Sequence, residues 1–161
     1  MKTSQSTERT AFYAGSFDPF TLGHHDIARR ALQVFDRLVV GIGVNPDKQG
    51  FLAAAQRKRW IEQVFAGEPR VEVVCYDGLT VDAARDAGAC CLVRGARGPQ
   101  EFDEEMRLAA VNRDLDGIET VILPGNPALA HVSSTLVRQL IAFGRPVAHL
   151  LPPGAPLELL P

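Results

Sequence analysis

The residues best suited to chemistry in this chain are a histidine, a lysine and two arginines. His24 lies in GSFDPFTLGHHD (15–26), Lys48 in NPDKQG (45–50), and Arg94 and Arg97 in LVRGARG (92–98). The arginine fork and the lysine ammonium both bind phosphate, and histidine can donate a hydrogen bond to a phosphate oxygen as a cation or as a neutral tautomer. Together these residue types predict an anion site.

The first of these segments has the features of a turn between a strand and a helix. Gly15 permits a sharp turn, and Thr21 can cap a helix that begins near Gly23. His24 would then lie in the first helical turn, where free backbone N–H groups attract phosphate, and Ser16 adds a hydroxyl. The alternative is a strand-to-helix turn that carries a surface histidine.

The other basic segments also have simpler explanations. Arg94 and Arg97 can form ion pairs with EFDEE (Glu101 to Glu105), and Lys48 can be a solvated loop residue. The serines and threonine of 133–135 can simply cap the last helix. The sequence leaves these alternatives open.

Several common chemistries find no support in the sequence. His24 and His25 are adjacent and so point to different sides of a helix, which excludes metal-ligand spacing for the pair; we expect His25 to be an exposed helix residue. No Ser-His-Asp or Cys-His pairing is evident. GIGVNP (41–46) lacks the last glycine of a dinucleotide fingerprint, and no P-loop is present. The basic segments therefore favour polyphosphate binding over a covalent intermediate.

Alternating strands and helices must position these residues. Apolar runs predict strands at 11–15, 37–44, 70–76, 89–95 and 118–124, and helical periodicity predicts helices at 24–36, 53–67, 80–88, 99–115 and 133–144. This order predicts an α/β fold: a Rossmann-like, doubly wound, five-stranded parallel sheet with helices on both faces. The loops after the strands (15–24, 45–52, 76–80, 94–98 and 124–134) then share one edge, where ligands bind in such sheets.

The bulk composition is that of one soluble domain, 1–161, with a polar tail at 1–10. The 161 residues are 46% hydrophobic with a net charge of −2, so no general field favours nucleic acid or an anionic membrane. No apolar run approaches the roughly 20 residues of a membrane span, and the N-terminus lacks a secretory signal. We expect QRKRW (56–60) to be a solvated helix face, the three cysteines to be buried thiols, and the protein to be cytoplasmic.

The motifs together resemble a known family. Thr21-Leu22-Gly23-His24 is similar to the T/H-x-G-H motif of a nucleotidyltransferase superfamily. With NPDK, GLTVDAAR, LVRGARG, EFDEEMRLAAVNR and VSSTLVRQL, the chain from Phe12 to about Leu160 resembles the phosphopantetheine adenylyltransferases. The resemblance implies transfer of AMP from ATP to 4′-phosphopantetheine by direct in-line attack, with Mg²⁺, giving dephospho-coenzyme A and pyrophosphate. It also implies a homohexamer and makes coenzyme A a candidate feedback inhibitor.

The same resemblance implies roles for individual residues. Catalytic roles fall on His24, Lys48 and Arg94, and contacts to the acceptor substrate on Ser16, Lys48, Thr80 and Arg94. Contacts to ATP fall on Ser16, Phe17, His24, Gly95, Ala96, Arg97 and Glu105, and on the run Leu129, Ala130, His131, Val132, Ser133, Ser134 and Thr135. No protein ligand to the metal is implied.

Three features depart from the family pattern. Glu104 stands where members often have tyrosine, the run 125–132 has no aromatic residue, and the segment after Asn112-Arg113 is about two residues short. Two alternatives therefore stay open: a nucleotidyltransferase with another acceptor, such as nicotinamide mononucleotide, and a non-catalytic paralogue that binds nucleotide or coenzyme A. The pantetheine-side match of GLTVDAAR argues against the first, and the intact basic residues argue against the second. Nothing supports a flavodoxin-like or dinucleotide-binding module.

Overall fold

The computed structural model describes residues 8–161, and these contain a parallel sheet of five strands. The strands are β1 (Thr10–Gly15), β2 (Arg37–Gly43), β3 (Val71–Tyr76), β4 (Cys91–Ala96) and β5 (Glu119–Pro124). Their order in the sheet is β3-β2-β1-β4-β5, and every neighbouring pair is parallel. The predicted Rossmann-like α/β fold is confirmed.

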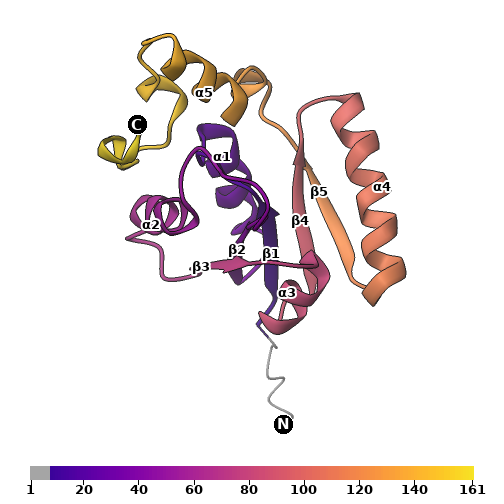
Figure 1. Cartoon of the computed structure of the whole chain (residues 1–161). Helices are drawn as coiled ribbons and strands as arrows, with labels where there is room; N and C mark the ends of the chain where they lie inside the picture. The colour runs from indigo at the N-terminus through magenta and orange to yellow at the C-terminus, as the bar shows by residue number, and fades with distance from the viewer. Residues whose placement is uncertain (1–7) are drawn as a thin grey trace.

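Helices cover both faces of this sheet (Figure 1). They are α1 (Leu22–Ala31), α2 (Ala54–Val64), α3 (Thr80–Asp86), α4 (Pro99–Asp116) and α5 (Ser134–Ala142), with short 3-10 helices at Pro127–Leu129, Ala148–Leu150 and Leu157–Leu159. One buried cluster joins the sheet to α1, α2, α5 and the C-terminal segment, and a second lies under α3. No helix of the described residues is both long and apolar enough to cross a membrane.

The central strand β1 shows why both faces are apolar. Phe12 belongs to one buried cluster and Tyr13 to the other, because successive side chains of a strand point to opposite faces. Phe12 packs so closely on β2 that a Cβ at Gly41 would lie 2.1 Å from its ring. The sheet order reverses between β1 and β4, which is the place where ligands bind in doubly wound folds.

The C-terminal segment packs onto the body of the molecule. Val147, Leu150 and Leu151 are buried in the same cluster as α1 and α2. The polar tail is shorter than predicted, because Thr10 already belongs to β1. Residues 1–7 lie outside the described residues. The first helix also ends earlier than predicted, at Ala31, since the chain turns through 32–34 before β2.

The predictions about the burial of the cysteines and of the segment 56–60 are wrong. Cys75 and Cys90 are exposed and only Cys91 is buried, because β3 is an edge strand and Cys90 precedes β4. Burial raises the pKa of the Cys91 thiol to about 12. Arg57, in the segment predicted to be solvated, is 7% exposed and donates hydrogen bonds to the carbonyl oxygens of Ser16 and Leu52.

Candidate active site

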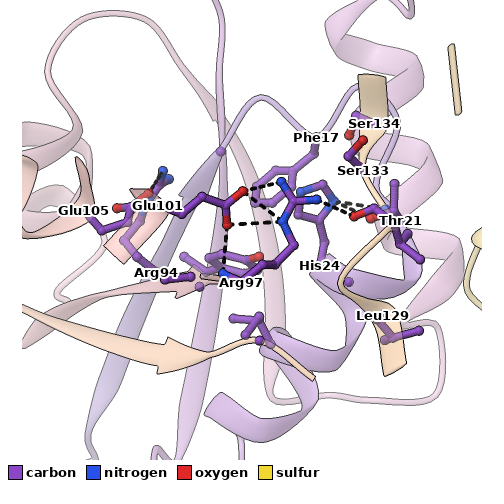
Figure 2. Close-up of a pocket in the computed structure, with 18 of the residues that line it drawn as sticks. Phe17, Thr21, His24, Arg94, Arg97, Glu101, Glu105, Leu129, Ser133 and Ser134 are labelled. Atoms are coloured by element: carbon purple, nitrogen blue, oxygen red, sulfur yellow. Dashed lines mark hydrogen bonds and ion pairs between the residues drawn. The ribbon is translucent and has the colours of Figure 1, made fainter. Parts of the chain in front are cut away.

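A cavity of about 380 Å³ opens at the carboxyl ends of β1 and β4, between the first turns of α1, α4 and α5. Thirteen of the predicted site residues line it: Ser16, Phe17, His24, Arg94, Gly95, Ala96, Arg97, Glu105, Leu129, Val132, Ser133, Ser134 and Thr135. Four do not: Lys48, Thr80, Ala130 and His131. The ends of separate strands and helices thus meet around one hollow (Figure 2).

The loop after β1 is shaped by Phe17. Its φ of 49° is rare for a residue with a side chain, and its ring folds back beneath Gly15, where a Cβ would lie 2.8 Å from the ring. The Phe17 side chain is therefore buried in the core, at 2% exposure, while Ser16 is exposed at the cavity. Any ligand contact by Phe17 must come mainly from its backbone.

His24 lies in the first turn of α1, as predicted, and its tautomer is fixed by the helix cap. The backbone N–H of Thr21, the N-cap residue, donates to Nδ1 of His24 at 3.0 Å. Nδ1 is therefore an acceptor, and the ring proton of the neutral form lies on Nε2. The Phe17 ring supports the imidazole edge-on, with centroids 5.1 Å apart. Burial, together with the positive charges of Arg97 and Arg94, lowers the pKa of His24 to about 4.

The neighbouring His25 differs from the prediction that it is exposed. It is half-buried, and its ring centroid lies 5.4 Å from that of Phe65 at the end of α2. Burial lowers its pKa. It does not line the cavity, so the two adjacent histidines face different surroundings.

Arg94 reaches from β4 to a carboxylate on α4. Its Nε and Nη2 donate to the two oxygens of Glu105 at 2.8 and 2.7 Å, and its Nη1 bonds to the carbonyl oxygen of Ala14. Burial opposes the charged form of Arg94, but the bonds to Glu105 outweigh it and raise its pKa. Both side chains are well covered, at 30% and 11% exposure. The alternative ion pairing with the EFDEE segment is therefore present in the structure.

Arg97 forms the second such pair, closer to solvent. Its Nε donates to Oε1 of Glu101 at 2.9 Å, its backbone N–H donates to Oε2 at 2.8 Å, and Nη2 also bonds to this carboxylate. Its remaining nitrogen, Nη1, donates to the carbonyl oxygen of Val132 at 2.8 Å. Figure 2 shows this pair in the middle of the view, with Arg94 and Glu105 on one side and Thr21 and His24 on the other.

The start of α5 is tied to the loop after β1. Ser134 Oγ donates to the carbonyl oxygen of Pro19 at 2.7 Å, and Arg138 Nη1 donates to that of Asp18, also at 2.7 Å. Ser133 Oγ accepts the N–H of Leu136, so this serine caps the helix, as the simpler explanation held. The cap brings the first turn of α5 to the cavity wall.

Thr80 lines a second, smaller cavity of about 110 Å³. Its Oγ1 is 2.9 Å from the hydroxyl of Tyr76, at the end of β3. Arg94 and Glu105 line both cavities, so their ion pair lies between Thr80 and His24. The two hollows are therefore neighbours that share one wall.

Lys48 lies on the exposed loop between β2 and α2. This loop is fastened to the loop after β1, because the Asp18 carboxylate accepts the backbone N–H groups of Phe51 and Leu52 at 2.7 and 2.8 Å. Arg57 strengthens the junction through its bond to the Ser16 carbonyl oxygen at 2.8 Å. Lys48 thus follows β2 at the same end of the sheet as the cavity, although it does not line it.

The cavity wall also includes residues that the sequence did not single out as site residues. They are Tyr13, Ala14, Gly15, Thr21, Gly23, Ile27, Glu101, Glu104, Gly125 and Asn126. Glu101, Glu104 and Glu105 belong to the segment EFDEE, which was the alternative ion-pair partner of the arginines, and the loop 124–134 already contained Gly125 and Asn126. Tyr13 and Ile27 carried no signal beyond that of core residues. Within residues 8–161, no group of three His, Cys, Asp or Glu side chains could hold a metal ion.

Comparison with known proteins identifies the family of the chain. The model of the Cytidylyltransferase-like family matches residues 12–140, which run from β1 into α5. A phosphopantetheine adenylyltransferase of Porphyromonas gingivalis is 45% identical over 148 residues, 92% of this chain and 97% of the relative. The chain belongs to the phosphopantetheine adenylyltransferase family.

Other members of this family match the chain over similar spans. The phosphopantetheine adenylyltransferase of Phocaeicola vulgatus is 44% identical over 150 residues, 93% of this chain and 99% of the relative. That of Kocuria rhizophila is 44% identical over 146 residues, 90% and 94% of the two chains. The residues that line the cavity, between 13 and 135, lie within the residues 12–140 that the family model matches.

Proposed function

We propose that the protein transfers the adenylyl group of ATP to 4′-phosphopantetheine, giving dephospho-coenzyme A and pyrophosphate. An oxygen of the acceptor phosphate attacks the α-phosphorus of ATP, a new P–O bond forms, and the bond from that phosphorus to the bridging oxygen breaks. Pyrophosphate leaves with the electron pair. Because the attacking oxygen is already charged, the reaction needs positioning and charge stabilisation more than acid–base chemistry.

The observation that carries this proposal is the fixed tautomer of His24. Its Nδ1 accepts the Thr21 N–H at 3.0 Å, and burial holds its pKa near 4, so at neutral pH the ring is uncharged with its proton on Nε2. A neutral donor of this kind can stabilise the growing charge on an α-phosphate oxygen without giving up its proton. Losing one such donor costs on the order of 10² to 10³ in rate.

The basic residues serve the two anionic substrates. We assign Arg94 and Lys48 to the acceptor phosphate, together with Ser16, and Thr80 to the pantetheine arm. The assignment is supported by Arg94 lining both cavities and by the bonds that fasten the Lys48 loop to the loop after β1.

We assign the larger cavity to ATP. Its contacts come from His24, the Gly95 to Arg97 turn, Glu105 and the run from Leu129 to Thr135 at the start of α5. The free N–H groups of a helix N-terminus favour phosphate, which supports placing the triphosphate near Ser134. Ala130 and His131 do not line the cavity, so they belong to this assignment only through the resemblance.

Mg²⁺ fits this site as a cation carried by the substrate. The cavity carboxylates Glu101 and Glu105 are held by arginines, and the described residues offer no cluster that could cage a metal. Mg²⁺ commonly binds through substrate phosphates and water, and when bound it would offset part of the triphosphate charge. We assign no protein ligand to it.

We further propose that the protein is cytoplasmic and works as a homohexamer, with coenzyme A as a feedback inhibitor. The long helix α4 supports self-association: only Glu105 among its residues is buried, whereas Leu108, Val111 and Leu115 are each about half-exposed, at 50, 54 and 54%. Light scattering on Val111→Glu tests this. We expect a smaller particle than for the wild type, with Val34→Glu as the control, because Val34 is an apolar residue of similar exposure (45%) in the turn between α1 and β2.

The reaction is tested by measuring pyrophosphate release with ATP, Mg²⁺ and 4′-phosphopantetheine. We expect turnover in the wild type, a loss of 10² to 10³ in His24→Ala, and nearly normal turnover in the control His25→Ala, whose side chain does not line the cavity. Equal loss in both variants would contradict the assigned role of His24.

The same assay separates the alternatives. Pyrophosphate release with nicotinamide mononucleotide but not with phosphopantetheine would replace the acceptor. ATP binding without pyrophosphate release from either acceptor would replace the enzyme with a binding protein.

A further inference from the structure

Glu101 occupies an anion position inside the cavity. Its carboxylate accepts hydrogen bonds from three nitrogens of Arg97: from Nε at 2.9 Å to Oε1 and 3.2 Å to Oε2, from the backbone N–H at 2.8 Å, and from Nη2. Because Nη1 of Arg97 donates to Val132, all the nitrogen groups of this arginine are engaged within the protein. Glu101 and Arg97 both line the cavity that also contains His24.

These bonds are the ones that a phosphate would make. A guanidinium fork together with a backbone N–H is a common way of holding phosphate oxygens, and a carboxylate uses the same geometry. The hydrogen bond from Arg97 lowers the pKa of Glu101, so the carboxylate is charged at neutral pH. The protein thus places its own anion on an arginine that faces the cavity.

We propose that Glu101 sets the affinity of the ATP site by competing with the triphosphate for Arg97, and that triphosphate binding displaces the carboxylate. This inference rests on the proposed function, since it takes the larger cavity as the site of ATP. An internal competitor weakens binding, because the free energy of breaking the Arg97–Glu101 pair is subtracted from the favourable free energy of binding the triphosphate.

Burial indicates that Glu101, and not Glu105, is the displaceable carboxylate. The Glu101 side chain is 37% exposed and that of Arg97 is 38% exposed, so the carboxylate can rotate into water once the pair opens. The Glu105 side chain is only 11% exposed and lies against Arg94 between the two cavities. Separating that pair would leave a charge covered by protein, which is costly.

The variant Glu101→Gln isolates the charge of the carboxylate. Glutamine has the same length and keeps an oxygen that can accept the Arg97 N–H, but it holds the guanidinium less strongly. The matched control is Glu104→Gln, on the same helix and lining the same cavity, where no ion pair is formed among the described residues. Both variants remove one negative charge from the cavity wall, so both reduce the electrostatic repulsion of the triphosphate. A difference between them therefore reports on the ion pair with Arg97.

Calorimetry measures the dissociation constant of ATP for the wild type and the two variants. We expect Glu101→Gln to bind ATP about three- to tenfold more tightly than Glu104→Gln does. In an Arg97→Gln background the same substitution should give no such gain, because the competing pair no longer exists. Equal affinities of the two single variants, or weaker binding by Glu101→Gln, would overturn the proposal and make Glu101 a residue that orients Arg97.

Inorganic tripolyphosphate, titrated in the same series, separates this inference from the proposed function. If no protein of the series binds ATP but Glu101→Gln binds tripolyphosphate more tightly than Glu104→Gln, the competition stands and the nucleotide assignment fails. If ATP binds all proteins equally well, the assignment stands and the competition is refuted. If neither anion binds any protein of the series, both fail.

Discussion

The half-buried, neutral imidazole of His24 predicts a dependence of stability on pH that can be measured directly. The pKa of His24 is lowered from an ordinary value of 6.5 to about 4 in the folded protein. Between these values the unfolded chain binds more protons than the native state, so the free energy of unfolding rises with pH. The contribution is fully present above about pH 6.5 and is lost as the pH falls through 4.

The size of this effect follows from the difference between 6.5 and about 4. At ~1.4 kcal/mol for each pH unit, the two limits differ by about 3.5 kcal/mol, of which about 3 kcal/mol falls between pH 4 and 7. Denaturant unfolding of the wild type and of His24→Gln at several pH values between 4 and 7 measures this contribution. The carboxylates and His25 titrate in both proteins, so the difference between the two curves isolates His24. We expect that difference to change by about 3 kcal/mol across the range.

Parallel curves for the two proteins would refute the reasoning, because they would mean that His24 titrates alike when folded and unfolded. An NMR titration of the imidazole gives the same answer from a second observable. For catalysis, a neutral donor predicts that kcat does not fall between pH 6 and 8 through titration of His24. A fall in kcat with an apparent pKa near 6.5 that is present in the wild type and absent in His24→Gln would contradict the neutral tautomer.

Further predictions concern the remainder of the fold. Cys75 and Cys90 should react with a thiol reagent in the native protein, while Cys91, buried and with its pKa raised to about 12, should react only on unfolding; three fast thiols would contradict this. Arg57→Met should lower the free energy of unfolding by about 1–3 kcal/mol in denaturant titrations, because two carbonyl oxygens lose their donor; an unchanged midpoint would be unexpected. Leu150→Ala should cost about 2–5 kcal/mol by the same measurement if the C-terminal segment is part of the core, and much less if it is not.

The sequence predicts the elements of the fold well, because the evidence for them is local. A continuous apolar run such as RLVVGIGV is typical of a parallel-sheet strand that is covered on both faces, and the structure has β2 there. Helix caps are also local signals, and Thr21 and Ser133 are the N-cap residues of α1 and α5 in the structure. The order of the strands was outside the prediction, because it depends on which neighbours the crossover helices bring together.

The errors concern burial, which is not a local property. Arg57 lies in a charged run on α2, yet the loops after β1 and β2 close over it and offer it two carbonyl oxygens. His25 shows the same effect, since Phe65 from α2 covers it. Cys75 is the opposite case: an apolar strand suggests burial, but β3 lies at the edge of the sheet. In each case burial depends on which other elements of the fold pack against the residue, and not on its own segment alone.

The location of the candidate site was predictable, but the bonding within it was not. Topology requires the loops after parallel strands to meet at one edge, so His24 and the two arginines were expected together. Whether the two arginines form ion pairs with the glutamates of α4 or stay unpaired in the absence of an anionic ligand depends on the geometry of side chains from β4 and α4. Lys48 shows the limit of the topological reasoning, because it follows β2 at the correct edge but does not line the cavity.

The two explanations of LVRGARG, an anion site and an ion-pair network, describe the same arginines in two states. An arginine held ready for phosphate next to other positive groups would destabilise the ligand-free protein unless an anion accompanied it. Glu105 and Glu101 provide that anion, one covered and one at the opening. A triphosphate carries more charge than a single carboxylate, so it can take over the exposed arginine while the covered pair keeps its place. The acidic helix that follows the two arginines is therefore part of the anion site, and Glu101 is the residue that competes with the triphosphate for Arg97.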